Sequence, residues 1–237
     1  PSLVVVSGDL TQRAKVPEFI SARDWLARLP TPRLIVPGNH DVPLYDIVRR
    51  FTAPLGRYRA YICADTEPYW GDAELSVLGI TTARSWTWKG GRINARQMAA
   101  IRRRLSPANP SAFKVVVTHH QFIPPEGGAF EHVVGRADHA VRDLEACSVD
   151  LLLAGHLHRG FTGDVKSHYQ TITRSILVAQ AGTATSRRRR GEANSYNLIT
   201  IDGPSLAIAV RAWDGARFVG VGEARFEKHA GEWRKRP

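Results

Sequence analysis

The chain has 237 residues, of which 43% are apolar and 23% charged, a composition typical of a globular domain with a full hydrophobic core. No run approaches the roughly 18 consecutive apolar residues of a membrane-spanning helix, so a membrane span is not expected. Two isolated cysteines, Cys63 and Cys147, argue against a disulfide framework or a thiolate zinc site. They favour a reducing, cytoplasmic location. The net charge of +11 favours polyanionic partners and keeps nucleic acid open as one of them.

Apolar runs and amphipathic stretches alternate along the first two thirds of the chain. Continuous Val, Leu and Ile runs predict strands that are covered on both faces, at residues 3–6, 34–36, 115–117 and 151–154. Apolar residues at helical spacing predict helices over residues 18–29, 94–105 and 137–147. The last third predicts antiparallel strands at residues 175–181, 196–201, 205–212 and 217–226. We therefore expect a single α/β domain over residues 1–237.

Four of the predicted strands are followed at once by polar side chains that can bind metal ions. These side chains lie in Gly8-Asp9, in the Gly-Asn-His-Asp run at 38–41, in His119-His120 and in the Gly-His-Leu-His run at 155–158. The carboxyl ends of strands in an open α/β sheet border the crevice where ligands bind. Mixed carboxylate, amide and imidazole ligands suit Mn, Fe, Zn or Co. Two such ions, about 3.5–4 Å apart, can clamp a phosphoryl group.

In their order and composition, these four blocks resemble the signature blocks of the calcineurin-like metallophosphoesterase superfamily, and the chain is similar in compactness to its bacterial phosphodiesterase-like branch. The resemblance implies a bridging carboxylate at Asp9. It implies that Asn39, His119 and His156 bind one metal ion and that His158 binds a second.

The resemblance also implies roles in catalysis and substrate binding. His40 matches the histidine that stabilises developing charge or protonates the leaving oxygen, and Asp41 is predicted to orient it. His120 and Arg187 are predicted to contact substrate. Trp86 and Trp88 are open to two interpretations, either as the lining of a substrate groove or as half-buried anchors of a loop.

The fold that the resemblance implies is a four-layer αββα sandwich of two mixed β-sheets flanked by helices. The Asp-x-His block that opens the family's pattern does not occur in the chain, so we expect it on a first strand upstream of Pro1. Without that block, the domain is N-terminally incomplete. Of the two divalent metal sites, one is then complete and the other is a half-site.

The leading functional hypothesis is hydrolysis of a phosphate ester by a metal-activated hydroxide. The expected substrate is a small-molecule phosphodiester, such as a cyclic nucleotide. One alternative is a DNA or RNA nuclease of the same superfamily, which the positive charge favours. Another is a non-catalytic metal-binding protein, which the absent block favours. The sequence indicates neither the oligomeric state nor the native metal.

Overall fold

The computed structural model describes residues 1–106, 109–125, 133–186 and 192–236 of the chain. Five helices are described within these ranges: α1 (Val16–Leu26), α2 (Ile47–Thr52), α3 (Gly56–Tyr61), α4 (Ala95–Leu105) and α5 (Ala137–Ala146). The first eight strands are β1 (Val4–Val6), β2 (Arg33–Ile35), β3 (Tyr69–Gly71), β4 (Leu75–Gly79), β5 (Phe113–Val117), β6 (Leu151–Ala154), β7 (Phe161–Asp164) and β8 (Leu177–Gln180). The last four are β9 (Ser195–Asp202), β10 (Ser205–Trp213), β11 (Phe218–His229) and β12 (Glu232–Lys235).

A six-stranded mixed sheet in the order β3-β4-β5-β6-β8-β7 forms the centre of the molecule. Its inner strands β4, β5, β6 and β8 are parallel to one another. Successive residues of β5 are buried on opposite faces: Val115 and Val117 belong to one hydrophobic cluster and Val116 to another. Burial of such a side chain stabilises the fold by about 1.5–3 kcal/mol. Burial on both faces explains why the strand is a continuous apolar run.

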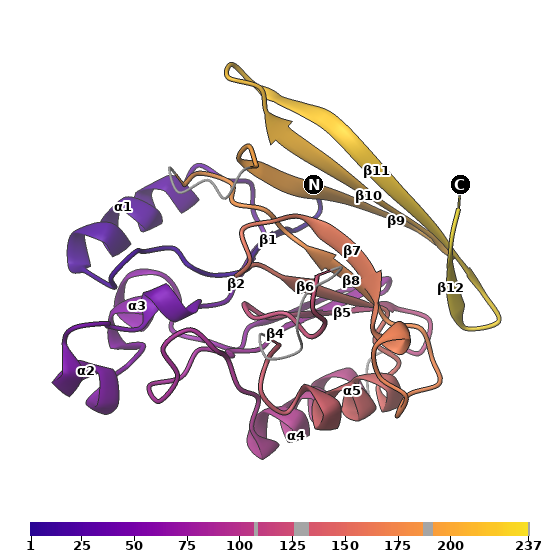
Figure 1. Cartoon of the computed structure of the whole chain (residues 1–237), viewed down its shortest axis with the longest axis horizontal. Coiled ribbons are helices and arrows are strands. Elements are labelled where there is room, and N and C mark those ends of the chain that lie inside the picture. The colour runs from indigo at the N-terminus through magenta and orange to yellow at the C-terminus, as the bar shows by residue number, and fades with distance from the viewer. Residues whose placement is uncertain (107–108, 126–132, 187–191, 237) are drawn as a thin grey trace.

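The second layer contains a four-stranded antiparallel sheet, β12-β11-β10-β9, and the parallel pair β1-β2. Leu206 and Ile208 of β10 and Leu34 of β2 share one hydrophobic cluster with Val115 and Val117 of the central sheet. Figure 1 shows the four-stranded sheet above the central one. The two sheets therefore pack face to face around a common core.

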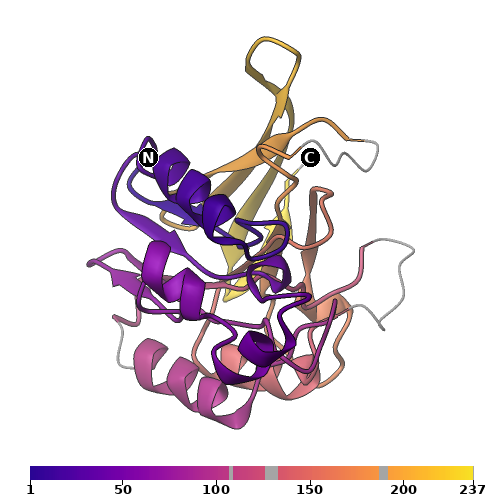
Figure 2. The same ribbon diagram turned by 90° about the vertical axis from the view of Figure 1, so that its left-hand side faces the viewer.

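Helices cover the outer face of the central sheet and pack beside the β1-β2 pair. Helices α4 and α5 pack against the central sheet through Ile101, Leu105 and Leu144. Helices α1 and α3 pack with Ile35 of β2 through Phe19 and Tyr58, respectively. Figure 2 shows α1, α2 and α3 together on one side of the molecule. The expected α/β sandwich of two sheets flanked by helices is confirmed.

Helix α4 shows how a local sequence signal sets an element. Asn94 caps its first turn by accepting a hydrogen bond from Gln97 N at 3.0 Å, which contributes about 1 kcal/mol. Ile101 and Leu105 face the core, while the basic run at 102–104 is exposed. Within the described ranges, no helix has both the length and the apolar character needed to cross a membrane.

Candidate metal centre

The carboxyl ends of four strands bring the predicted ligands together. Asp9 follows β1, Asn39 follows β2, His119 follows β5 and His156 follows β6. The loops after β1 and β2 lead to α1 and α2, on the side of the molecule that carries α1 to α3 in Figure 1. These two loops approach so closely that a Cβ atom at Gly8 would lie 2.6 Å from Gly38 N. Gly8 also has a φ of +94°, a conformation that favours glycine.

Four side chains meet at hydrogen-bonding distance. His119 Nε2 lies 3.0 Å from Asn39 Oδ1 and 3.3 Å from Asp9 Oδ1. His156 Nδ1 lies 3.0 Å from Asn39 Oδ1 and 3.2 Å from His119 Nε2. The structure therefore brings together Asp9, Asn39, His119 and His156, the four residues that the sequence assigns to one metal site.

The hydrogen-bond partner of His119 shows what this cluster requires. His119 Nδ1 lies 2.7 Å from the carbonyl oxygen of Ser7, which can only accept, so Nδ1 carries a hydrogen. A neutral His119 then presents its Nε2 lone pair to the oxygens of Asp9 and Asn39, which also carry lone pairs. Such an arrangement is repulsive unless a proton or a metal cation lies between these atoms. A divalent cation fits this donor set.

The pKa values of the paired groups shift in opposite directions. Burial favours the neutral form of Asp9, but the charges of His119 and His40 and their hydrogen bonds outweigh it and lower the pKa of this carboxyl. Burial likewise disfavours the charged form of His119, but Asp9 outweighs it and raises the pKa of the imidazole. Both shifts have the same cause, since the cluster stabilises a positive charge at its centre.

Asp41 connects the loop after β1 with the loop after β2. It is 1% exposed, and its Oδ1 accepts hydrogen bonds from the backbone and hydroxyl of Thr11. Its Oδ2 accepts from Gly38 N and Leu10 N at 2.9 and 3.2 Å. Burial, with a smaller contribution from the charge of Asp9, raises the pKa of Asp41 to about 6. These contacts place Asp41 in a positioning role for the two loops, whereas its predicted orientation of His40 stays a prediction.

His40 is placed beside the cluster by its own backbone. Its N–H donates to Asp9 Oδ1 at 3.0 Å. Its ring Nδ1 lies 2.8 Å from the carbonyl oxygen of Gln12, so Nδ1 carries a hydrogen and Nε2 is the atom that can exchange a proton. This geometry suits the predicted acid role, which stays a prediction.

His120 is held by contacts at both ring nitrogens. Its Nδ1 lies 2.7 Å from Thr82 Oγ1 and its Nε2 3.0 Å from the carbonyl oxygen of Lys89. Burial, together with the neighbouring His119 and His156, lowers its pKa well below the ordinary value, so the ring is neutral at pH 7. Ligand atoms of His119, His120 and His156 lie within 4.8 Å of one another. Its predicted contact with substrate stays a prediction.

The remaining predicted residues are His158, Arg187 and the two tryptophans Trp86 and Trp88. His158 Nδ1 lies 2.6 Å from Thr183 Oγ1, and its role as ligand of a second metal stays a prediction. Arg187 lies outside the described residues. Trp86 and Trp88 are 84% and 56% exposed, so they are not the half-buried anchors of one interpretation. They belong to the loop whose Lys89 carbonyl contacts His120.

Several residues that support the cluster were not predicted. Ser7, Thr82 and Thr183 orient the rings of His119, His120 and His158, respectively. Partners of this kind fix the tautomer and direction of metal-binding histidines. Thr82 and Thr183 lie far along the chain from the rings they contact, and Ser7 acts through its carbonyl, which every residue has. No sequence signal identifies them.

The comparison with protein families gives the class of this site. The family model of calcineurin-like phosphoesterases matches residues 1–160. The chain therefore belongs to the calcineurin-like phosphoesterase family, and the resemblance seen in its four sequence blocks is confirmed.

Three individual proteins that resemble the chain are 14–29% identical to it. A probable cyclic nucleotide phosphodiesterase of Synechococcus sp. is 29% identical over 171 residues, which cover 68% of this chain and 59% of that protein. Among solved structures, Vps29 of Chaetomium thermophilum is 14% identical with a TM-score of 0.44, covering 96% of this chain and 82% of that one. A Vps29 single mutant from Entamoeba histolytica is 15% identical with a TM-score of 0.45, covering 96% and 83%. TM-scores this low carry no argument about function.

Proposed function

We propose that the protein is a metal-dependent phosphodiesterase that acts on a small substrate of the cyclic-nucleotide class. One observation carries the proposal: the side-chain lone pairs of Asp9, Asn39, His119 and His156 converge within 3.0–3.3 Å. Membership of the phosphoesterase family supports the reaction class, and the cyanobacterial relative supports the substrate class.

The residues divide into those that hold metal and those that act beside it. Asp9, Asn39, His119 and His156 would hold one divalent cation, and His158 is the candidate from this chain for a second. Bound divalent cations would polarise the phosphoryl oxygens and lower the pKa of a water molecule. The backbone of His40 donates to Asp9 and its Nδ1 contacts Gln12 O, so Nε2 is the ring atom that would donate a proton to the leaving oxygen. Asp41 and Thr11 keep the two loops that carry Asp9 and His40 in place.

Two exposed indoles on the loop beside His120 support a substrate with a planar group. Trp88 already stacks on one face against the guanidinium of Arg50, whose carbon lies 4.6 Å from the ring centroid. Arg50 also donates to the carbonyl of Thr87 at 2.9 Å, which steadies this loop. An aromatic surface held in this way can stack on a nucleobase, a contact worth about 1–3 kcal/mol.

A nuclease of the same family is the second candidate, and the net charge of +11 favours it. The exposed basic run at 102–104 lies on α4, on the outer face of the central sheet. A nuclease would bind DNA or RNA with an affinity that falls steeply as salt is added. Retention of turnover on cyclic nucleotides, with no binding of nucleic acid at moderate salt, would exclude it.

Turnover measurements test the proposal directly. The purified protein is assayed with Mn, Fe, Zn, Co and no added metal, against bis-p-nitrophenyl phosphate, p-nitrophenyl phosphate and 2′,3′- and 3′,5′-cyclic nucleotides. We expect metal-dependent hydrolysis of the diesters in preference to the monoester.

A matched pair of variants controls this assay. His119→Ala removes a ligand from the cluster and is expected to abolish turnover. His139→Ala removes a histidine whose side chain is 62% exposed on α5 and is expected to leave turnover unchanged. No hydrolysis of any of these esters with any of the four metals would overturn the proposal and favour a non-catalytic metal-binding protein.

A further inference from the structure

Five large apolar side chains are exposed close together on α2 and on two loops next to it. Ile47, Val48 and Phe51 lie on α2, Tyr45 lies just before it, and Trp86 lies on the loop that contains Lys89. Their exposed fractions run from 46% for Phe51 to 84% for Trp86. Single exposed apolar residues are ordinary on a protein surface, but a contiguous group marks a surface of interaction. We call these five residues the apolar patch.

Contacts within the apolar patch show that it is continuous. The ring centroids of Phe51 and Trp86 lie 4.7 Å apart, which joins α2 to the loop. Ile47 and Val48 lie four and three residues before Phe51, so both are its neighbours on the helix surface. The carbonyl oxygen of Tyr45 accepts from Ile47 N at 3.0 Å, which places Tyr45 against the first turn. Figure 1 shows α2 at the outer edge of the molecule, so the patch lies on a projecting part of the surface.

Two exposed cations border the apolar patch. The guanidinium carbon of Arg13 lies 5.5 Å from the ring centroid of Tyr45, and Lys89 is exposed on the loop that carries Trp86. Neither Arg13 nor Lys89 forms a salt bridge within the part of the chain that the structure describes. Their positive charges are therefore available to a partner.

The carboxylate at the start of α2 does not cancel this charge. Asp46 Oδ2 lies 3.1 Å from Arg49 Nε and 3.6 Å from Arg57 Nη2, so one acidic group faces two basic ones. The surface is thus apolar at its centre and positively charged around it.

This charge decides which partner fits the apolar patch. A symmetric contact between two copies would bring each patch against the same patch of the other copy, so the positive charges of Arg13 and Lys89 would repel their counterparts. Indole and phenol rings beside aliphatic and basic side chains are instead typical of segments that rest on a bilayer, where basic residues attract anionic lipids. We propose that the apolar patch docks the protein onto the surface of a bilayer that contains anionic lipids.

Docking through the apolar patch would hold the metal centre near the bilayer. Helix α2 follows the loop that carries Asn39 and His40, and the carbonyl of Lys89 contacts His120. Trp88, which faces Arg50, is not part of the patch and stays available to a substrate. Docking requires neither bound metal nor turnover, so it can fail while the protein is an active phosphodiesterase, and the reverse.

Sedimentation with sucrose-loaded vesicles tests the docking. The purified protein is mixed with vesicles of phosphatidylcholine alone and with vesicles in which part of this lipid is replaced by phosphatidylglycerol. We expect the protein to sediment with the mixed vesicles and to bind phosphatidylcholine alone about tenfold more weakly, because the two free cations then have no anionic lipid to attract them.

Two double variants separate contact by the apolar patch from general attraction by the net charge of +11, which both variants keep. Val48→Ser with Trp86→Ser removes two side chains of the patch and is expected to weaken binding to mixed vesicles by about tenfold or more. Val221→Ser with Tyr196→Ser removes two exposed side chains of the four-stranded sheet and is expected to bind like the parent. All four side chains are exposed, so both variants are expected to fold.

Three results would overturn the proposal. The parent fails to sediment with the mixed vesicles. The two double variants bind these vesicles equally well, which would show that net charge alone holds the protein there. Size-exclusion chromatography with light scattering finds a dimer of the parent that dissociates in Val48→Ser with Trp86→Ser, which would show that a second copy covers the patch.

Discussion

At the carboxyl ends of β5 and β6, His119 and His156 direct lone pairs toward the oxygens of Asp9 and Asn39. At the amino ends of the same strands, Trp233 and Arg174 present N–H groups with no acceptor among the described residues. The first site lacks positive charge at its centre, whereas at the second Asp150 is already paired with Lys228 and Arg174. Figure 1 shows β12 on the opposite side of the molecule from α1 to α3, which follow the loops of the metal site.

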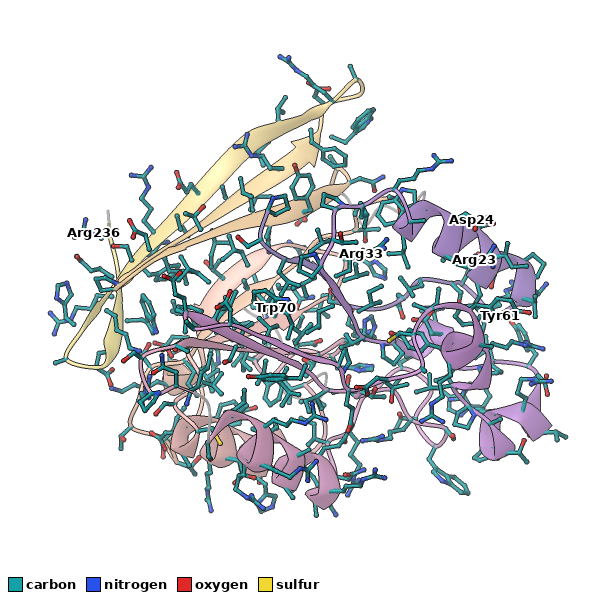
Figure 3. All side chains as sticks on the ribbon, turned by 180° about the vertical axis from the view of Figure 1, so that it is seen from behind. Arg23, Asp24, Arg33, Tyr61, Trp70 and Arg236 are labelled. Atoms are coloured by element: carbon teal, nitrogen blue, oxygen red, sulfur yellow. The ribbon has the colours of Figure 1, made fainter. Side chains whose placement is uncertain are left out.

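The comparison teaches that side-chain lone pairs that converge without a donor indicate the charge of the ligand that completes them, whereas a carboxylate with two cationic partners is complete within the protein. Buried polar groups are nearly always paired, so an unpaired set indicates what completes it. Figure 3 gives the same separation from behind: Arg236, which follows β12, lies at the other end of the molecule from Arg23 and Asp24 of α1. The two sites can therefore be tested independently, because distant substitutions are additive.

The largest expected effect concerns the division of roles at the metal end. His156→Ala is expected to lose bound metal and turnover together, because it removes a ligand from the cluster. His40→Ala is expected to keep its metal and to slow turnover about 10²- to 10⁴-fold, the range for loss of a general acid. Elemental analysis of the purified variants, paired with steady-state kinetics, checks both. Equal loss of metal in the two variants would show that His40 is itself needed to hold the ion.

The candidate metal ligands could be predicted from the sequence because they directly follow predicted strands. β6 was predicted with its observed bounds, Leu151–Ala154, and His156 follows two residues later. The polar cluster at the amino ends of the same strands has no comparable signal in the sequence. Asp150, Arg174, Lys228 and Trp233 are separated by loops and whole strands, and only the packing of the two sheets brings them together.

The elements that sequence reasoning missed share a physical cause. β4 (Leu75–Gly79) is central in the sheet, but its apolar pattern is broken by Ser76, which is buried and lies 3.2 Å from the hydroxyl of Tyr69. α2 and α3 have six residues each, too few for a helical period to stand out. Their formation depends on tertiary contacts such as the hydrogen bond from Tyr58 to Ile35 O.

Asp41→Asn should produce the largest loss of stability. It tests whether the hydrogen bonds of Asp41 hold together the two loops that carry Asp9 and Asn39. The carboxylate of Asp41 faces only donors, from Leu10, Thr11 and Gly38. An amide would turn its NH₂ toward two of them, at a cost of about 2–4 kcal/mol in the free energy of unfolding. Chemical denaturation measures this.

A matched substitution separates burial from hydrogen bonding. Asp214→Asn lies in an exposed turn, where its Oδ1 accepts from Ala216 N and Arg217 N. The expected loss is below about 1 kcal/mol, because water replaces the lost contacts. Equal losses in the two variants would mean that Asp41 does not act as a buried clamp.

Lys228→Met tests how much Asp150, at the amino end of β6, depends on the second of its two cationic partners. Arg174 stays on Asp150 in this variant, so the carboxylate keeps a charged partner. We expect a loss of about 1 kcal/mol in the free energy of unfolding, smaller than for Asp41→Asn, because Lys228 is partly solvated. Chemical denaturation measures this, and an unchanged free energy of unfolding would show that the ion pair between Lys228 and Asp150 does not stabilise the fold.

The smallest effect is expected from Glu145→Gln, and it depends on pH. Glu145 Oε1 accepts from Thr173 N at 2.6 Å and Arg174 N at 2.8 Å, which positions Arg174 beside Asp150. Partial burial disfavours the charged form of Glu145, but these hydrogen bonds outweigh it and lower its pKa below the ordinary value of 4.5. A carboxyl whose pKa is lower in the folded state stabilises the fold above pH 4.5 and loses that contribution as the pH falls through the folded value.

Unfolding temperatures between pH 7 and pH 3 check this prediction. The parent should lose more stability than Glu145→Gln on acidification, by less than about 1 kcal/mol, because the carboxylate is largely solvated. Glu223→Gln, an exposed pair with Arg225 on β11, is the control and should follow the parent. If Glu145→Gln follows the parent as well, Glu145 does not anchor Arg174, and the ion pair with Asp150 is what positions Arg174.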